Sequence, residues 1–234
     1  MEASKQLFRC SRLGALMTES KTKNELSETT KSYLLEVMIY DRFKIRKDIS
    51  TAAINKGLQV EEQAITLYSL NKMKMYRKNE ITLKNDFIIG TPDLFEGEDI
   101  QLATKIIDTK SSWDIFTFFK SKHDKINKDY YWQLQGYMAL TGATESSIAY
   151  CLIDTPETIV NDEKRRLLWN MGTTDETDEV YESACREIER RHKYSNIMGE
   201  QERLHEVVIE RDNEAIERLY ERIEQCRKYL KTLS

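Results

Sequence analysis

Two aspartates and a lysine near the middle of the chain are of the residue types that metal-dependent chemistry uses. Asp93 and Asp108 lie 15 positions apart, and Lys110 follows the second aspartate by two positions. Each aspartate lies just after a short apolar run rich in isoleucine, and such runs are typical of buried strands. Side chains alternate between the faces of a strand, so we expect Asp108 and Lys110 to point the same way and Thr109 the other.

The segment between the two aspartates predicts a hairpin. Residues 96–99 (EGED) form an acidic turn with one glycine between the two apolar runs, and a turn there would fold the chain back on itself. The fold-back would bring Asp93, Asp108 and Lys110 together at a strand end. Carboxylate oxygens suit hard divalent cations, and a nearby ammonium group offsets charge that builds on a phosphate. This arrangement predicts metal-assisted hydrolysis of a phosphodiester.

The residues just before Asp93 should interrupt regular pairing. Pro92 has no amide hydrogen to donate, so the strand is expected to be edge-like or bulged at this point. Such a bulge can turn a side chain toward a site. Further upstream, residues 73–83 predict a polar strand or a pair of turns, and the basic residues around them are expected to be solvated.

A third carboxylate is expected to come from a helix over residues 50–71. Gly57, Glu61, Ala64 and Tyr68 fall on one face of that helix. A glycine on this face would let another backbone approach closely, and a carboxylate on a packing face needs a charged partner. Glu61 is therefore the candidate third acid, although Glu61 and Glu62 could both be solvated helix charges. Which of the two glutamates faces inward stays open.

Several further residues are of types that contact phosphates. Ser11 and Arg12 offer a hydroxyl and a guanidinium group, while the alternative is an ordinary helix with Ser11 as its N-cap. The basic segment 120–128 is either a contact for the backbone of duplex DNA or a solvated surface. Gln133 and Tyr137 share one face of a helix predicted over 127–141.

The remaining elements follow from hydrophobic periodicity. A helix over 27–43, a strand over 146–154, a charged helix over 175–194, a strand over 204–209 and an amphipathic helix over 213–230 are predicted. Residues 165–169 fit either a strand or the end of a helix. No internal repeat or low-complexity linker is present, so residues 1–234 are interpreted as a single domain that closes with the late strand and the amphipathic helix.

Composition narrows the class of protein. The apolar content of 40% supports a core, while the charged content of 32% implies a well-solvated surface. No apolar run approaches the ~20 residues of a membrane helix, and the first ten residues (MEASKQLFRC) do not resemble an export signal. We therefore expect a cytoplasmic protein with no membrane contact. The net charge of −4 argues against a protein that coats nucleic acid by bulk attraction, but it allows a local basic groove.

The candidate residues form four motifs, which follow one another in a fixed order along the chain. They are Gly57-x3-Glu61-x2-Ala64-x3-Tyr68, Gly90-Thr-Pro-Asp93, Asp108-Thr-Lys110 and Gln133-x3-Tyr137. Together they resemble the PD-(D/E)xK nuclease superfamily, and within it the RecB/YqaJ-like branch that includes phage lambda-type exonucleases. An isolated acid-x-Lys occurs by chance in any charged chain, whereas four motifs in order are specific. One departure is Asp108, where many members of the superfamily have Glu.

The resemblance implies a fold and roles for these residues. The fold would be α/β (α+β), with a mixed central sheet flanked by helices in a restriction-endonuclease-like core. Asp93 and Asp108 would ligate Mg²⁺ or Mn²⁺, as two ions in all, with the Thr109 carbonyl and Glu61 completing the ligands. Lys110 would position or activate the attacking water. The remaining family positions, Gln133, Tyr137, Ser11 and Arg12, would contact DNA, with Gln133 and Tyr137 orienting either its backbone or Lys110.

The resemblance also implies an activity and partners. The protein would be a metal-dependent exonuclease that resects linear double-stranded DNA for phage-type recombination in a bacterial or phage-infected cell. A single-strand-annealing protein and a homo-oligomer, a trimer by analogy, are the implied partners. The alternatives are a structure-dependent or restriction-type endonuclease and a non-catalytic DNA-binding protein that keeps the fold. Some members of the branch carry an iron–sulfur cluster, but the four cysteines are scattered, so we expect reduced thiols and no cluster.

Overall fold

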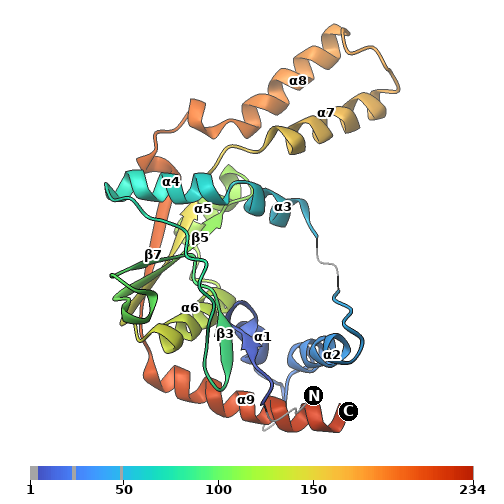
Figure 1. Ribbon diagram of the computed structural model, residues 1–234. Helices are drawn as coiled ribbons and strands as arrows, with labels where there is room; N and C mark the ends of the chain where they lie inside the picture. Colours follow the sequence, from blue (N-terminus) through green and yellow to red (C-terminus); the bar gives the residue numbers. More distant parts are fainter. Residues whose placement is uncertain (1–4, 23–24, 48–49, 234) are drawn as a thin grey trace.

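The protein is built from two small sheets with helices packed around them (Figure 1). The computed structural model describes residues 5–22, 25–47 and 50–233, so the first four residues of the segment considered for an export signal lie outside it. In Figure 1 the elements form an open arc, with a long C-terminal helix along one end and a pair of helices projecting from the other. None of the helices in the described residues is long and apolar enough to span a membrane.

The larger sheet has four strands in the order β4-β5-β6-β7. They are β4 (Leu94–Glu96), β5 (Lys105–Ser111), β6 (Glu145–Cys151) and β7 (Leu204–Glu210). β5 and β6 run parallel, while the two outer pairings are antiparallel. The mixed sheet, the hairpin between the two aspartates and the late strand are thereby confirmed.

The smaller sheet contains the apolar run that precedes Asp93. Its strands are β1 (Phe8–Arg9), β2 (Leu83–Lys84) and β3 (Ile88–Gly90), with β3 in the middle. The prediction of one strand leading directly to Asp93 was wrong, because β3 and β4 belong to different sheets. Pro92 cannot donate to a ladder, and the chain crosses between the sheets at residues 91–93.

Two helices sandwich the larger sheet. α4 (Glu61–Lys72) packs on one face, where Tyr68 joins Ile107 and Leu94 in a buried cluster. α6 (Lys128–Thr141) packs on the other face, where its apolar residues join the main core. Successive residues of β5 face opposite helices, so its odd-numbered residues face α4 and its even-numbered residues face α6.

The other helical segments complete the arc. They are η2 (Cys10–Arg12), α1 (Leu13–Leu16), α2 (Glu28–Phe43), α3 (Ala52–Gln59), η3 (Ile100–Leu102), α5 (Ile115–His123), α7 (Glu157–Met171), α8 (Glu179–His192), η4 (Tyr194–Asn196), η5 (Gln201–Arg203) and α9 (Asn213–Leu233). α7 and α8 form the projecting pair in Figure 1, and α9 lies along the opposite end.

The predicted helix over 50–71 is two helices instead of one. The backbone leaves helical geometry at Val60, with φ −109° and ψ 10°, which separates α3 from α4. Gly57 therefore does not belong to the helix that carries Tyr68. A Cβ added at Gly57 would meet no atom within 4 Å, so the expected close approach of another backbone is also wrong.

The helices predicted over 27–43 and 127–141 are confirmed, and a capping residue marks the start of each. Ser27 accepts a hydrogen bond from Thr30 N at the start of α2, and Asn127 accepts one from Asp129 N at the start of α6. α6 ends at Gly142, whose φ of 81° suits glycine. Residues 165–169, which the sequence left open, are helical within α7.

Candidate active site

The pairing of β4 with β5 brings the two aspartates together. Leu94 lies opposite Ile107 in this antiparallel pair, so the residue before Leu94 and the residue after Ile107 are neighbours across the strands. Asp93 is fixed there by β5, because Thr109 donates two hydrogen bonds to Asp93 Oδ2. The backbone amide does so at 2.8 Å and the hydroxyl at 3.1 Å.

Asp108 lies at the buried centre of this arrangement, with 1% of its surface exposed. Its Oδ1 accepts a hydrogen bond from Gln133 Nε2 at 2.9 Å, and its Oδ2 lies 2.5 Å from Lys110 Nζ. The ammonium group of Lys110 also lies 5.3 Å from the centre of the Tyr130 ring. The contact between Asp108 and Lys110 shows that the two side chains point the same way, toward α6.

The charges at the site favour the binding of a further cation. Burial and the nearby charge of Asp108 raise the pKa of Asp93 to about 7, although Lys110 and the Thr109 hydrogen bonds act in the opposite direction. Burial would lower the pKa of Lys110, but the two carboxylates outweigh it and raise that pKa above its ordinary value. Two carboxylates thus face one ammonium group in a poorly solvated place, and a divalent cation would remove the repulsion between them.

The donor set fits a hard metal ion bound by few protein ligands. Asp93 and Asp108 offer carboxylate oxygens, which Mg²⁺ and Mn²⁺ prefer. Mg²⁺ often uses only one or two carboxylates and keeps several waters. In the part of the chain that the structure describes, no group of three or more His, Cys, Asp or Glu side chains is gathered as a metal cluster. The two aspartates therefore form the core of the candidate metal site.

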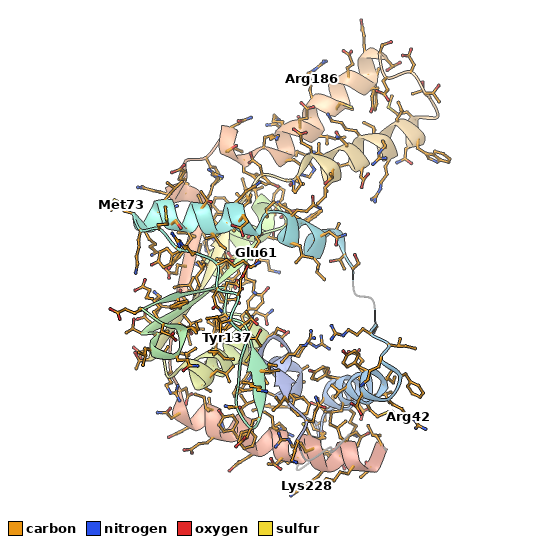
Figure 2. The ribbon with its side chains drawn as sticks, in the orientation of Figure 1. Arg42, Glu61, Met73, Tyr137, Arg186 and Lys228 are labelled. Atoms are coloured by element: carbon orange, nitrogen blue, oxygen red, sulfur yellow. The ribbon has the colours of Figure 1, made fainter. Side chains whose placement is uncertain are left out.

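Glu61 is placed differently from its predicted role. It is the first residue of α4, and its Oε2 accepts a hydrogen bond from Lys78 Nζ at 2.6 Å. Glu61 is half-buried, whereas Glu62 is exposed, so Glu61 is the glutamate that turns inward. Figure 2 shows Glu61 on α4 and Tyr137 on the far side of the larger sheet. The structure brings Glu61 to a lysine and does not gather it with the two aspartates.

Gln133 and Tyr137 support Asp108 from α6. Gln133 Nε2, which donates to Asp108, also lies 3.0 Å from Tyr137 Oη. Tyr137 packs against Gly90, where an added Cβ would lie 2.7 Å from the tyrosine ring and 2.8 Å from Cys10 Sγ. Gly90 is therefore required for this packing. In the structure the glutamine contacts Asp108 and not Lys110.

The two candidate phosphate contacts near the N-terminus, Ser11 and Arg12, have different surroundings in the structure. Ser11 lies in η2, where no side-chain cap is made, and it lines a cavity of about 340 Å³ together with Arg9, Thr91 and Tyr137. Arg12 instead pairs with an acid of α2 and lines a different cavity. Arg9 and Thr91 were not identified from the sequence, because neither residue type is distinctive without knowledge of which strands meet.

The basic segment 120–128 lies on the surface at the end of α5. Lys122 packs over the rings of Phe118 and Phe119, at 4.5 Å and 4.9 Å from their centres. Lys120 lies 3.9 Å from Asp124. The Lys120 side chain is exposed to solvent, whereas Lys122 Nζ donates a hydrogen bond to Glu202 O at 3.4 Å.

Comparison with known proteins gave matches in family and in structure. Residues 5–144 match the YqaJ-like viral recombinase domain. A phage-related exonuclease from Haemophilus somnus 129PT is similar over 98% of this chain and 95% of its own, with 27% identity and a TM-score of 0.75. An alkaline exonuclease from Laribacter hongkongensis is similar over 98% and 90%, with 16% identity and a TM-score of 0.64. Its complex with dAMP gives 17% identity, coverage of 99% and 91%, and a TM-score of 0.62. No curated protein sequence matched.

Proposed function

The chain belongs to the YqaJ-like viral recombinase family, and on this premise we propose that it is a metal-dependent exonuclease that degrades linear double-stranded DNA from its ends. The observation that carries the proposal is the meeting of Asp93, which directly precedes β4, with Asp108 and Lys110 of the adjacent strand β5. The likeness to the phage-related exonuclease over nearly the whole of both chains supports it.

The chain's own residues supply binding and orientation. Asp93 and Asp108 would hold Mg²⁺ or Mn²⁺, with the Thr109 carbonyl as a further oxygen ligand. Such an ion, when bound, supplies Lewis-acid activation of the phosphodiester. Lys110, held against Asp108, would position the attacking water and offset negative charge on the phosphate. Gln133 fixes the Asp108 carboxylate, which is almost fully buried.

The cavity beside the site suits a terminal phosphate. Ser11, Thr91 and Arg9 line it with two hydroxyls and a guanidinium group, and Tyr137 connects it to Asp108 through Gln133. Hydroxyl and guanidinium donors are the usual phosphate contacts. Arg12 is a weaker candidate, because Glu36 neutralises it at 3.3 Å. The complex of the Laribacter exonuclease with dAMP supports a site for a nucleotide in this fold.

Partners follow by analogy with the family. The proposed substrate is a duplex DNA end, and the proposed setting is phage-type recombination with a single-strand-annealing protein. A homo-oligomer is proposed on the same ground. These partners rest on the family match alone.

The deciding experiment compares two forms of one DNA. End-labelled linear duplex and covalently closed circles of the same sequence are incubated with the protein in Mg²⁺, in Mn²⁺ and in excess chelator. We expect nucleotide release from the linear DNA only, and only with metal. Cutting of the circle would indicate an endonuclease. Binding without any nucleotide release in either metal would indicate a non-catalytic DNA-binding protein.

A further inference from the structure

We propose that Asn79 is a positioning residue that holds Asp93 in place for metal binding, an inference that rests on the proposed function. Asn79 lies in the polar segment between α4 and β2 and is 5% exposed. Such a segment ordinarily forms solvated turns. A buried asparagine within it needs hydrogen-bond partners, and here the partners lie in the backbone that carries Asp93.

The contacts of Asn79 form a clamp around Asp93, because they bond the backbone carbonyls on either side of its α-carbon. The Asn79 backbone amide donates to Asp93 O at 2.7 Å, and Asn79 Nδ2 donates to Pro92 O at 2.8 Å. The rest of the side chain is fixed by Ile81, whose carbonyl accepts from Nδ2 and whose amide donates to Oδ1, both at 3.1 Å. The side chain therefore cannot turn away from Pro92 without losing three hydrogen bonds.

The hydrogen bonds from Asn79 hold a part of the chain that is not held by the hydrogen-bond ladder of a sheet. Residues 91–93 cross from the smaller sheet to the larger one and belong to no strand. Pro92 has no amide hydrogen, and its carbonyl is buried in its contact with Asn79. Asp93 is thus held at two points, by Asn79 at its backbone and by Thr109 at its carboxylate. Ligands for metal ions depend on such supporting hydrogen bonds for their orientation.

The neighbouring lysine ties the same segment to α4. Lys78 donates to Glu61 at 2.6 Å, while the backbone amide of the next residue, Asn79, donates to Asp93 O. The segment therefore links Glu61 to the backbone of Asp93. Glu61 would then assist the site indirectly, by anchoring the irregular segment that carries Asn79.

The test is the binding of Mn²⁺ by the whole protein without DNA, measured by titration calorimetry, together with nucleotide release as a function of Mg²⁺ concentration. Asn79→Ala removes the two donations from Nδ2 and the hydrogen bond that Oδ1 accepts from Ile81 N. Asn71→Ala is the matched control. Asn71 lies at the C-terminal end of α4, and its Nδ2 also donates to two backbone carbonyls, those of Leu67 and Glu200. Thermal unfolding of both variants measures the purely structural cost.

We expect Asn79→Ala to weaken Mn²⁺ binding by about tenfold or more and to raise the Mg²⁺ concentration for half-maximal rate by a similar factor. KM for DNA should change little. Asn71→Ala should lower thermal stability but leave Mn²⁺ binding within about twofold of wild type. If Asn79→Ala does not fold, Asn79→Ser replaces it, because a serine hydroxyl can still cap Ile81 N in a local turn but is too short to reach Pro92.

Two failures are distinguishable. Wild-type protein that binds no Mn²⁺ and releases no nucleotides would contradict the proposed function itself. Wild-type protein that does both, beside an Asn79→Ala variant whose Mn²⁺ affinity equals that of Asn71→Ala, would overturn the role of Asn79 alone.

Discussion

Gln133 donates a hydrogen bond to Asp108 over 2.9 Å, from the helix that covers one face of the sheet to the strand at its centre. This bond fixes the rotamer of a carboxylate that is almost fully buried. A carboxylate in such a place binds a metal well only if its orientation is fixed beforehand. The catalytic consequences of Gln133 should therefore appear through Asp108.

Replacing Gln133 by methionine should reduce activity without unfolding the protein. Asp108 Oδ1 would lose its donor, so we expect nucleotide release to fall by about 10- to 100-fold. Gln135→Met is the matched control on the same helix. The side chain of Gln135 bonds the backbone of Glu210 and Asp212, so that variant should be destabilised by about 1–3 kcal/mol with an unchanged rate in its folded fraction. Equal rates for the two variants would contradict this role.

Removing either charged partner at the site should abolish cleavage. In Asp108→Ala a candidate metal ligand is lost, and in Lys110→Ala the cation that faces the phosphate is lost. We expect nucleotide release to fall by at least about a hundredfold in each case, with circular dichroism unchanged. Asp99→Asn is the control in the same hairpin, because the Asp99 side chain caps a short turn by accepting a hydrogen bond from Gln101 N. Full activity in either alanine variant would contradict the assignment.

Gly90 and Gly57 should respond to alanine in opposite ways. At Gly90 the added methyl group would crowd Tyr137 and Cys10 in the core, so we expect a loss of about 1–3 kcal/mol in the free energy of unfolding. At Gly57 the methyl group meets no neighbour, and alanine favours a helix by up to about 1 kcal/mol. Urea unfolding of both variants measures the difference. A stabilised Gly90→Ala variant would show that the packing under Tyr137 is loose.

Glu206 should make the free energy of unfolding depend on pH in the acidic range. Burial alone would raise the pKa of Glu206, but Lys72, Ser147 and Lys105 bond its carboxylate and lower the pKa from 4.5 to about 2. The folded state thus releases this proton more readily than the unfolded state does. The resulting stabilisation, about 3 kcal/mol, is fully present above pH 4.5 and is lost as the pH falls toward 2.

The comparison of wild type with Glu206→Gln isolates this contribution. We expect the difference in unfolding free energy to be constant from pH 7 to about 5 and to shrink as the pH decreases below 4.5, measured by urea titration at each pH. Parallel stability curves across the whole range would mean that the lysine contacts do not lower the pKa of Glu206.

The sequence predicted the parts of the site that depend on local pattern. The hairpin between Asp93 and Asp108, the shared direction of Asp108 and Lys110, and the helix that carries Gln133 all follow from turn residues, strand alternation and capping. These features depend on residues close in the chain. They were therefore recoverable from one sequence.

Features that depend on distant pairing were not recoverable. β3 pairs in parallel with β1, about 80 residues earlier, so its assignment to a second sheet could not be read from the run around Ile88. The break at Val60 has no glycine or proline to mark it. Asn79 lies in a stretch that is typical of solvated turns, and only the fold shows that its side chain reaches Pro92.

The metal site is tested most directly by a crystal of the protein that is soaked in Mn²⁺ and measured at a wavelength where manganese scatters anomalously. We expect an anomalous peak between the carboxylates of Asp93 and Asp108, with Lys110 still beside Asp108. A catalytically active crystal form with no manganese at those two side chains, or with the ion held elsewhere, would contradict the assignment of the metal site.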